Sequence, residues 1–244
     1  MDLSGKTAIV TGVTSGMGVA IVESLAGAGM NLAIAARRVE LLEKTAEVAR
    51  AAGAEVLAEP LDVADRAATS AFARAALDLF GGVDVLVNNA GTNSDPRTVA
   101  EIDPQDWDRV VRVNLTGAFN LAHALIPSMR AAGGGLIINV ASLAAFIPSG
   151  MAGSAYSASK AAMRALSINI NDEEWRNGIR ATTIHPGETD TPILDLRPEP
   201  PSAAERARMV QVEDIAEAVL FVVQLPARTK IDELIITPTH RRRG

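Results

Sequence analysis

The chain has 244 residues, of which 48 % are hydrophobic and only 3 % are aromatic, and its formal net charge is −6. This length and apolar share suit one large α/β domain with an aliphatic core, whereas the acidic balance disfavours nucleic acid, whose phosphates need a basic surface. Cysteine is absent, which excludes disulfides, thiolate nucleophiles and Cys-ligated zinc.

The beginning of the chain shows no targeting pattern. Residues 1–12 lead from a short polar segment into an apolar run, without the layout of a signal peptide. No stretch of about 18 or more uncharged apolar residues occurs, so the sequence predicts no membrane span. We therefore expect a cytoplasmic protein with neither a membrane nor a nucleic-acid partner.

Short runs rich in Val, Ile and Leu predict seven strands, at residues 7–10, 31–35, 55–57, 83–87, 136–140, 181–184 and 233–236. Apolar residues at helical spacing predict helices at 16–28, 39–52, 66–80, 105–130, 154–177 and 213–224. Strand and helix alternate throughout, and no linker divides the chain. The sequence therefore predicts a single domain, residues 1–244, with a Rossmann-type doubly wound sheet of seven mostly parallel strands and helices on both faces.

A glycine-rich turn follows the first predicted strand and leads directly into a helix. Glycines in such a turn let the backbone approach a ligand closely. The helix N-terminus adds unpaired N–H groups and a positive dipole end, which suit a pyrophosphate. The turn therefore predicts a dinucleotide site, formed by Gly12, Thr14, Ser15, Gly16, Met17 and Gly18.

The second predicted strand should end beside the adenosine ribose of such a dinucleotide. A carboxylate there would bind the 2′-hydroxyl of NAD, whereas an arginine suits the 2′-phosphate of NADP. The strand is followed by Arg37 and Arg38 and by no carboxylate. Because a guanidinium can make bidentate bonds to phosphate, we expect NADP(H), with Arg37 as the main ligand and Arg38 as the second. The alternative is an exposed arginine at a helix start.

Tyr156 and Lys160 lie four residues apart in a predicted helix, so both side chains share one face. A phenol has a pKa near about 10, and a nearby ammonium lowers that pKa. The phenol could then exchange a proton with a carbonyl or alcohol oxygen while hydride moves to or from a nicotinamide.

Ser142 ends the fifth predicted strand, at the edge where doubly wound sheets bind ligands. Its hydroxyl can bond the substrate oxygen and stabilise developing charge. The alternative is a turn or cap hydroxyl, which is a common use of serine.

Taken in order, these motifs resemble the short-chain dehydrogenase/reductase family over about residues 5–237. The resemblance rests on the T-G-x-x-x-G-x-G turn, the run Asn88-Asn89-Ala90-Gly91, Ser142, the Tyr-x-x-x-Lys pair and Pro186-Gly187. It implies that Asn114 interrupts its helix and holds a water linked to Lys160. It further implies cofactor contacts from Asp62, Val63, Asn89, Ala90, Gly91, Tyr156, Lys160, Pro186, Gly187, Thr189 and Thr191. Asp62 could also cap the following helix, and both roles could hold.

The resemblance implies an NADP(H)-dependent oxidoreductase that interconverts a carbonyl compound and a secondary alcohol. Its catalytic residues would be Asn114, Ser142, Tyr156 and Lys160. A non-catalytic redox sensor, or a dehydratase or epimerase of the same fold, remains an alternative. The resemblance also implies a homo-oligomer, a tetramer or dimer formed through the helices at 105–130 and 154–177.

The substrate side is less well defined by the sequence. Residues 192–209 are rich in proline and too long for a simple turn, so we predict a substrate-binding lid rather than an insertion without a role. Residues 93–97 and 143–153, including Phe146 and Met151, are expected to line an apolar substrate site. The loop between Ser142 and Tyr156 is one residue longer than is usual in the family, so we expect it to bulge. The three histidines are scattered and predict no metal site; His185 could approach the substrate or be structural.

Overall fold

The computed structural model describes residues 2–196 and 200–240. Its seven strands form one sheet in the order β3-β2-β1-β4-β5-β6-β7, and every pairing is parallel. The strands are β1 (Thr7–Thr11), β2 (Asn31–Ala36), β3 (Val56–Pro60), β4 (Val85–Asn88), β5 (Gly135–Val140), β6 (Ile179–Pro186) and β7 (Glu233–Ile236). The predicted fold class is thus confirmed.

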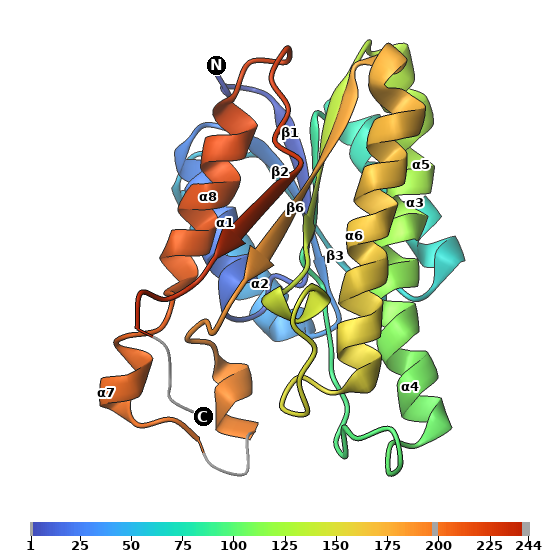
Figure 1. Cartoon of the computed structure of the whole chain (residues 1–244). Coiled ribbons are helices and arrows are strands. Elements are labelled where there is room, and N and C mark those ends of the chain that lie inside the picture. Colours follow the sequence, from blue (N-terminus) through green and yellow to red (C-terminus); the bar gives the residue numbers. More distant parts are fainter. Residues whose placement is uncertain (1, 197–199, 241–244) are drawn as a thin grey trace.

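Helices cover both faces of the sheet (Figure 1). On one face lie α1 (Met17–Gly27), α2 (Val39–Ala51) and α8 (Val212–Gln224), and on the other lie α3 (Arg66–Phe80), α5 (Gly117–Ala131) and α6 (Ser154–Glu174). Two shorter helices are α4 (Pro104–Val111) and α7 (Ala203–Arg206). A hydrophobic core lies on each face of the sheet, and successive strand residues point into one core and then the other. Val10 and Ile138 pack on the α1 side, and Ile9 and Ile137 on the α3 side. Burial on both faces explains why the strands read as continuous apolar runs.

The long helix predicted at 105–130 is not one regular helix. A π-helical segment, Arg112–Thr116, separates α4 from α5, and Asn114 lies within it. Because the chain stays helical on both sides, the periodicity of the apolar residues does not reveal the change. The interruption that the resemblance implied for Asn114 is present.

The strand order reverses between β1 and β4, which are neighbours although two strands intervene in the chain. Ligands of doubly wound sheets bind at the carboxyl ends of the strands where the order reverses. The loops that follow β1, β4, β5 and β6 therefore meet at one edge of the sheet. Within residues 2–196 and 200–240, no helix has both the length and the apolar character needed to span a bilayer.

Candidate active site

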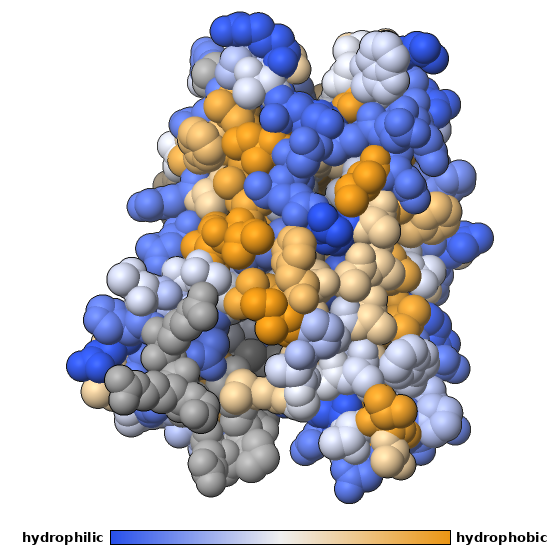
Figure 2. All heavy atoms as spheres, in the orientation of Figure 1, coloured by the Kyte–Doolittle hydropathy of each residue, from blue (hydrophilic) through white to orange (hydrophobic). Residues whose placement is uncertain are grey.

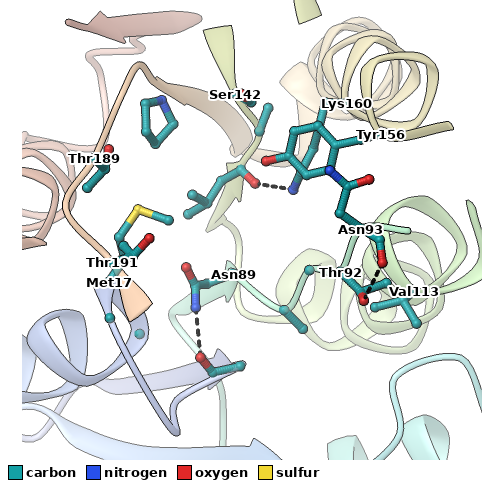
Figure 3. A pocket seen from close by; sticks show the side chains of 18 of the residues that line it. Met17, Asn89, Thr92, Asn93, Val113, Ser142, Tyr156, Lys160, Thr189 and Thr191 are labelled. Atoms are coloured by element: carbon teal, nitrogen blue, oxygen red, sulfur yellow. Dashed lines mark hydrogen bonds between the residues drawn. The ribbon is translucent and has the colours of Figure 1, made fainter. Parts of the chain in front are cut away.

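A cavity of about 640 Å³ opens at this edge of the sheet. Figure 3 shows side chains from several loops turned toward it. With the exception of Asn114, every residue predicted to be catalytic or to bind the cofactor lines the cavity. These are Gly12, Thr14, Ser15, Gly16, Met17, Gly18, Arg37, Arg38, Asp62, Val63, Asn89, Ala90, Gly91, Ser142, Tyr156, Lys160, Pro186, Gly187, Thr189 and Thr191.

The glycine turn, residues 12–18, packs backbone directly on backbone. A Cβ on Gly18 would lie 2.2 Å from the Gly12 carbonyl oxygen, and a Cβ on Gly12 would lie 2.7 Å from the Ala90 Cα. Gly12 also has a φ of 71°, a value that favours glycine. The Asn89 amide donates to the carbonyl oxygens of Thr11 at 3.1 Å and Gly12 at 3.0 Å, tying β4 to the turn. These contacts leave no room for a side chain at Gly12 or Gly18.

The same end of the cavity fits a dinucleotide. No side chain caps the N-terminus of α1 at Gly16, and its first turn carries no acidic residue. The free N–H groups and the positive dipole end thus face the cavity, as a pyrophosphate requires. The Asn89 Oδ1 is buried and has no hydrogen-bond partner among the described residues, so it offers an acceptor to a bound group.

The two arginines after β2 are used differently. Arg38 lies across the glycine turn, with Nη2 at 2.8 Å from the Thr14 hydroxyl and 3.4 Å from the Ser15 hydroxyl. Arg37 is exposed at the cavity wall, and no hydrogen bond or ion pair holds it within the described chain. Arg37 therefore has a guanidinium available to an anion, and its contact with a 2′-phosphate stays a prediction.

Asp62 is not the cap of α3, so the capping role considered for it is wrong. The cap is Asp65, whose carboxylate accepts from the Ala68 N–H at 3.0 Å. Asp62 accepts instead from the Ala64 N–H at 3.0 Å in a short turn at the cavity wall. Aspartate occurs at both positions, and only the actual start of the helix distinguishes them.

The predicted reacting centre consists of Ser142, which follows β5, and of Tyr156 and Lys160 in the first turns of α6 (Figure 3). The Ser142 hydroxyl accepts from the Ala144 N–H at 3.2 Å, so it also has the turn-capping role considered as its alternative. The Lys160 ammonium donates to the Val140 carbonyl oxygen at 2.8 Å and lies 5.7 Å from the centre of the Tyr156 ring. The three side chains thus meet at the end of β5.

Burial dominates the ionisation of this centre. It raises the pKa of Tyr156, while a hydrogen bond with Ser142 acts in the opposite direction. It lowers the pKa of Lys160 to about 8. Lys160 is not among the groups that shift the Tyr156 pKa here, because the ammonium points at the Val140 carbonyl rather than at the phenol oxygen. A lowering of that pKa by Lys160 with NADP⁺ bound stays a prediction.

Asn114 lies behind the cavity wall and is fully buried. Its Oδ1 accepts from the Thr92 N–H at 2.7 Å, and its amide donates to the Ser159 hydroxyl at 3.0 Å. A Cβ on Gly91 would lie 3.6 Å from both the Asn114 Oδ1 and the Lys160 Nζ. The Asn114 Oδ1 and the Lys160 Nζ thus lie beside the same space next to Gly91, and the role of Asn114 through a water stays a prediction.

The Pro186–Gly187 turn forms the wall opposite α6. The Gly187 N–H donates to the Ile236 carbonyl at 2.7 Å, and the Thr189 hydroxyl donates to the Gly187 carbonyl at 3.3 Å. Thr191 lies over the glycine turn, since a Cβ on Gly16 would be 3.2 Å from its methyl carbon. The turn after β6 therefore covers the turn after β1.

The substrate side is held together by contacts between distant loops. Arg97 donates to the Met151 carbonyl at 2.8 Å, and Asn93 donates to the Ala152 carbonyl at 2.9 Å. Met151 lines the cavity as expected, but Phe146 does not. The loop after Ser142 begins with a 3₁₀ turn, Leu143–Ala145, and this turn directs Phe146 onto His185 instead.

Sequence reasoning missed several further lining residues, Thr92 and Val113 among them. Both adjoin residues that it had identified, Gly91 and Asn114, and this proximity was the available signal. In the predicted lid, Pro192 and Leu194 line the cavity, and Arg206 of α7 pairs with Asp190 at 3.0 Å and with Asp195. Residues 197–199 of the lid lie outside the described residues, and its function stays a prediction. No cluster of three His, Asp or Glu side chains suited to a metal occurs in the described parts of the chain.

Comparison with known proteins gives consistent matches. Residues 6–201 match the family model of short chain dehydrogenases. An uncharacterized oxidoreductase of Staphylococcus epidermidis is 30 % identical over 233 residues, which cover 96 % of this chain and 97 % of that protein. The glycine betaine reductase of Emericella nidulans is 32 % identical over 97 % of this chain, but the match covers only 19 % of that larger protein.

Two solved structures extend the comparison to three dimensions. The alcohol dehydrogenase of the archaeon Thermococcus sibiricus, in complex with 5-hydroxy-NADP, superposes with a TM-score of 0.86 at 31 % identity, covering 98 % of this chain and 99 % of that one. A metagenomic short-chain oxidoreductase in complex with NADP superposes with a TM-score of 0.85 at 32 % identity, covering 99 % of this chain and 100 % of that one.

Proposed function

This chain belongs to the short-chain dehydrogenase family of oxidoreductases, and from that premise we propose that it is an NADP(H)-dependent enzyme that interconverts a carbonyl compound and a secondary alcohol. One observation carries the proposal: Ser142, Tyr156 and Lys160 meet at the wall of the cavity whose floor is the glycine turn. A hydride donor lying across that floor would have its reactive end beside an acid–base group.

The cofactor, when bound, supplies or accepts the hydride. Tyr156 is the group that handles the proton, because its hydroxyl lies at the cavity wall in a hydrogen bond with Ser142. Since burial raises its pKa, the phenol is protonated at neutral pH and can donate to a carbonyl oxygen. Ser142 would bond the same oxygen. Lys160 carries a charge below pH 8, and that charge favours the phenolate left after donation.

The preference for NADP(H) is supported by the uncommitted Arg37 at the end of β2 and by NADP in the two related structures described above. A guanidinium at this point pairs with a 2′-phosphate, and the described part of the cavity wall offers no carboxylate directly after β2 for a 2′-hydroxyl. Asn114 would act through Lys160, behind Gly91.

The proposal is tested by following NADPH oxidation with a panel of ketones and aldehydes, and NADP⁺ reduction with secondary alcohols. We expect turnover with some members of the panel. The Tyr156→Phe variant should lose about 10³-fold in kcat while it still binds NADPH. Unchanged turnover in Tyr156→Phe would contradict the role of the phenol.

The same experiment separates the alternatives. A redox sensor would bind NADPH without turnover of any substrate in the panel. Because a sensor does not need Ser142, Tyr156 and Lys160, their presence favours the enzyme. A dehydratase or epimerase would form product without net oxidation of NADPH, which product analysis would detect.

We further propose that the protein is a homo-oligomer, a dimer or tetramer, in the cytoplasm. Figure 2 shows apolar side chains gathered over α8 and β7, where Phe221 is 52 % and Ile235 is 54 % exposed. Phe119 of α5 and Ile168 of α6 are also exposed. Exposed apolar patches on a protein surface commonly mark interfaces. Light scattering of the purified protein gives the number of subunits, and a monomer would contradict the proposal.

A further inference from the structure

His185 lies directly behind the reacting centre and is fully buried. The backbone hydrogen bonds between β5 and β6 end where the Ala141 N–H donates to the Ile184 carbonyl at 2.8 Å. One residue further along, a side chain joins the two segments: the His185 Nδ1 lies 3.2 Å from the Ser142 carbonyl oxygen. A carbonyl can only accept a hydrogen bond, so Nδ1 must carry the proton.

Three other side chains surround the imidazole ring. The Phe146 ring packs against it with centroids 4.5 Å apart. The Glu233 carboxylate lies 3.8 Å from Nε2 and forms an ion pair of 2.6 Å with Arg164. The Arg164 guanidinium in turn lies 4.8 Å from the centre of the Phe146 ring. The four residues form a closed cluster that joins β6, β7, α6 and the turn after β5.

The bond to Ser142 constrains the residue that would contact the substrate. The Ser142 carbonyl also accepts from the Ala145 N–H at 3.0 Å, so two donors fix the orientation of this peptide group. The direction of the Ser142 hydroxyl depends on that orientation. His185 also precedes the Pro186–Gly187 turn, so one residue connects Ser142 with the opposite wall of the cavity.

We propose that His185 is a positioning residue for Ser142, and that Phe146 serves to hold its ring, with Arg164 and Glu233 packed behind the two rings. His185 is not among the residues that line the cavity, so it acts through Ser142 and not on the substrate. Its effect on turnover rests on the proposed function, whereas the hydrogen bond itself can be tested without any substrate. Burial lowers the pKa of His185, which leaves the ring neutral at pH 7 with its single proton on Nδ1.

The hydrogen bond is tested by NMR of protein labelled with ¹⁵N-histidine. The chain has only three histidines, and the signals of the exposed His123 and His240 are identified by their loss in His123→Asn and His240→Asn. The remaining histidine should be protonated at Nδ1 and unprotonated at Nε2 at pH 7, with slow exchange of its proton. A proton on Nε2 alone would overturn the proposal.

The effect on Ser142 is tested with three substitutions of His185. Asparagine places an amide N–H close to the position of Nδ1, glutamine places it one bond further away, and leucine has no donor. We expect kcat to fall about tenfold in His185→Leu and His185→Gln, with the KM for NADPH unchanged, and to be largely restored in His185→Asn. Equal loss in all three variants, or wild-type kcat in His185→Leu, would overturn the proposal.

The surface histidine His123 provides a matched control, because it too packs against a phenylalanine, Phe119, with centroids 5.6 Å apart. His123→Leu should keep wild-type kcat. If Tyr156→Phe retained activity, the proposed function would fail, while the NMR measurement would still decide whether His185 bonds to Ser142.

Discussion

The glycine turn and the reacting centre lie at opposite ends of one cavity, and they are built in different ways. At the glycine turn, backbone packs against backbone, and the Gly12 carbonyl is so close to Gly18 that no side chain fits. At the reacting centre, by contrast, Lys160 is only 3 % exposed and its ammonium bonds to a carbonyl. The first end depends on missing side chains, whereas the second depends on polar side chains that are costly to bury.

The difference has a consequence for stability. A tight glycine turn favours the fold and the site together, because the packing that shapes it also joins β1 to β4. A buried ammonium opposes the fold, since it loses its hydration. Substitutions at the two ends should therefore change stability in opposite directions.

The largest expected effect is at the glycine turn. In Gly18→Ala the new Cβ would lie 2.2 Å from the Gly12 oxygen, so the free energy of unfolding should fall by about 3 kcal/mol and cofactor binding should be lost. Gly150→Ala is the matched control, because nothing lies within 4 Å of its Cβ position, and it should change stability by less than about 0.5 kcal/mol. Chemical denaturation measures the stability of each variant, and calorimetric titration measures its NADPH binding. Equal stability and equal binding in Gly18→Ala and Gly150→Ala would contradict the packing argument.

The opposite sign is expected at Lys160. Burial lowers its pKa from 10.5 to about 8, so below pH 8 the folded protein carries a charge that Lys160→Met lacks. Between pH 8 and 10 the folded lysine loses its proton before the unfolded one, and the wild type gains about 2 kcal/mol relative to the variant. Denaturation at pH 7 and at pH 10 measures this change. If the difference in the free energy of unfolding between the wild type and Lys160→Met did not depend on pH, the lysine would not be buried as described.

A smaller effect separates the two arginines. Arg37→Ala should weaken NADPH binding about 10- to 100-fold, through the loss of a charged hydrogen bond, and leave NADH binding unchanged. Arg38→Ala should weaken both cofactors, because Arg38 bonds to Thr14 and Ser15 in the turn itself. Calorimetric titration with NADPH and with NADH measures how far each variant weakens the binding of each cofactor. A uniform loss in Arg37→Ala would contradict its proposed contact with the 2′-phosphate.

The smallest change is spectroscopic. Tyr156 is the only tyrosine in the chain, so ultraviolet titration of phenolate reports on this group alone. In the protein without cofactor, the midpoint should lie above about 10, the ordinary value for a phenol, and Ser142→Ala should raise it further. A midpoint below that value would restore the earlier expectation of an activated phenol.

The sequence predicted most of the glycine-turn end, because its signals are local. The glycines, the strand before them and the helix after them lie within one short stretch, and the order of strands and helices placed the turn at the correct edge of the sheet. It also identified Ser142, Tyr156 and Lys160, although not the direction of the ammonium.

Other features of the reacting end are not local and were not predicted. The contact from Arg97 to Met151 crosses 54 positions, and that from His185 to Ser142 crosses 43. Such pairs leave no periodic pattern in a single sequence. The same reason explains why Phe146 was placed in the cavity, since nothing near it in the chain indicates that it packs on a residue of β6.

The π-helical segment at Arg112–Thr116 has a consequence beyond Asn114. A π turn holds one residue more than an α turn, and each residue of an α-helix advances about 100° around the axis. The wide turn absorbs this extra residue, so winding the same residues as a regular α-helix would rotate α5 relative to α4 by about that angle. Leu121 and Leu125, now fully buried, would then turn away from the sheet. The wide turn therefore sets the phase between the helix that faces the active-site loops and the helix that packs on the core.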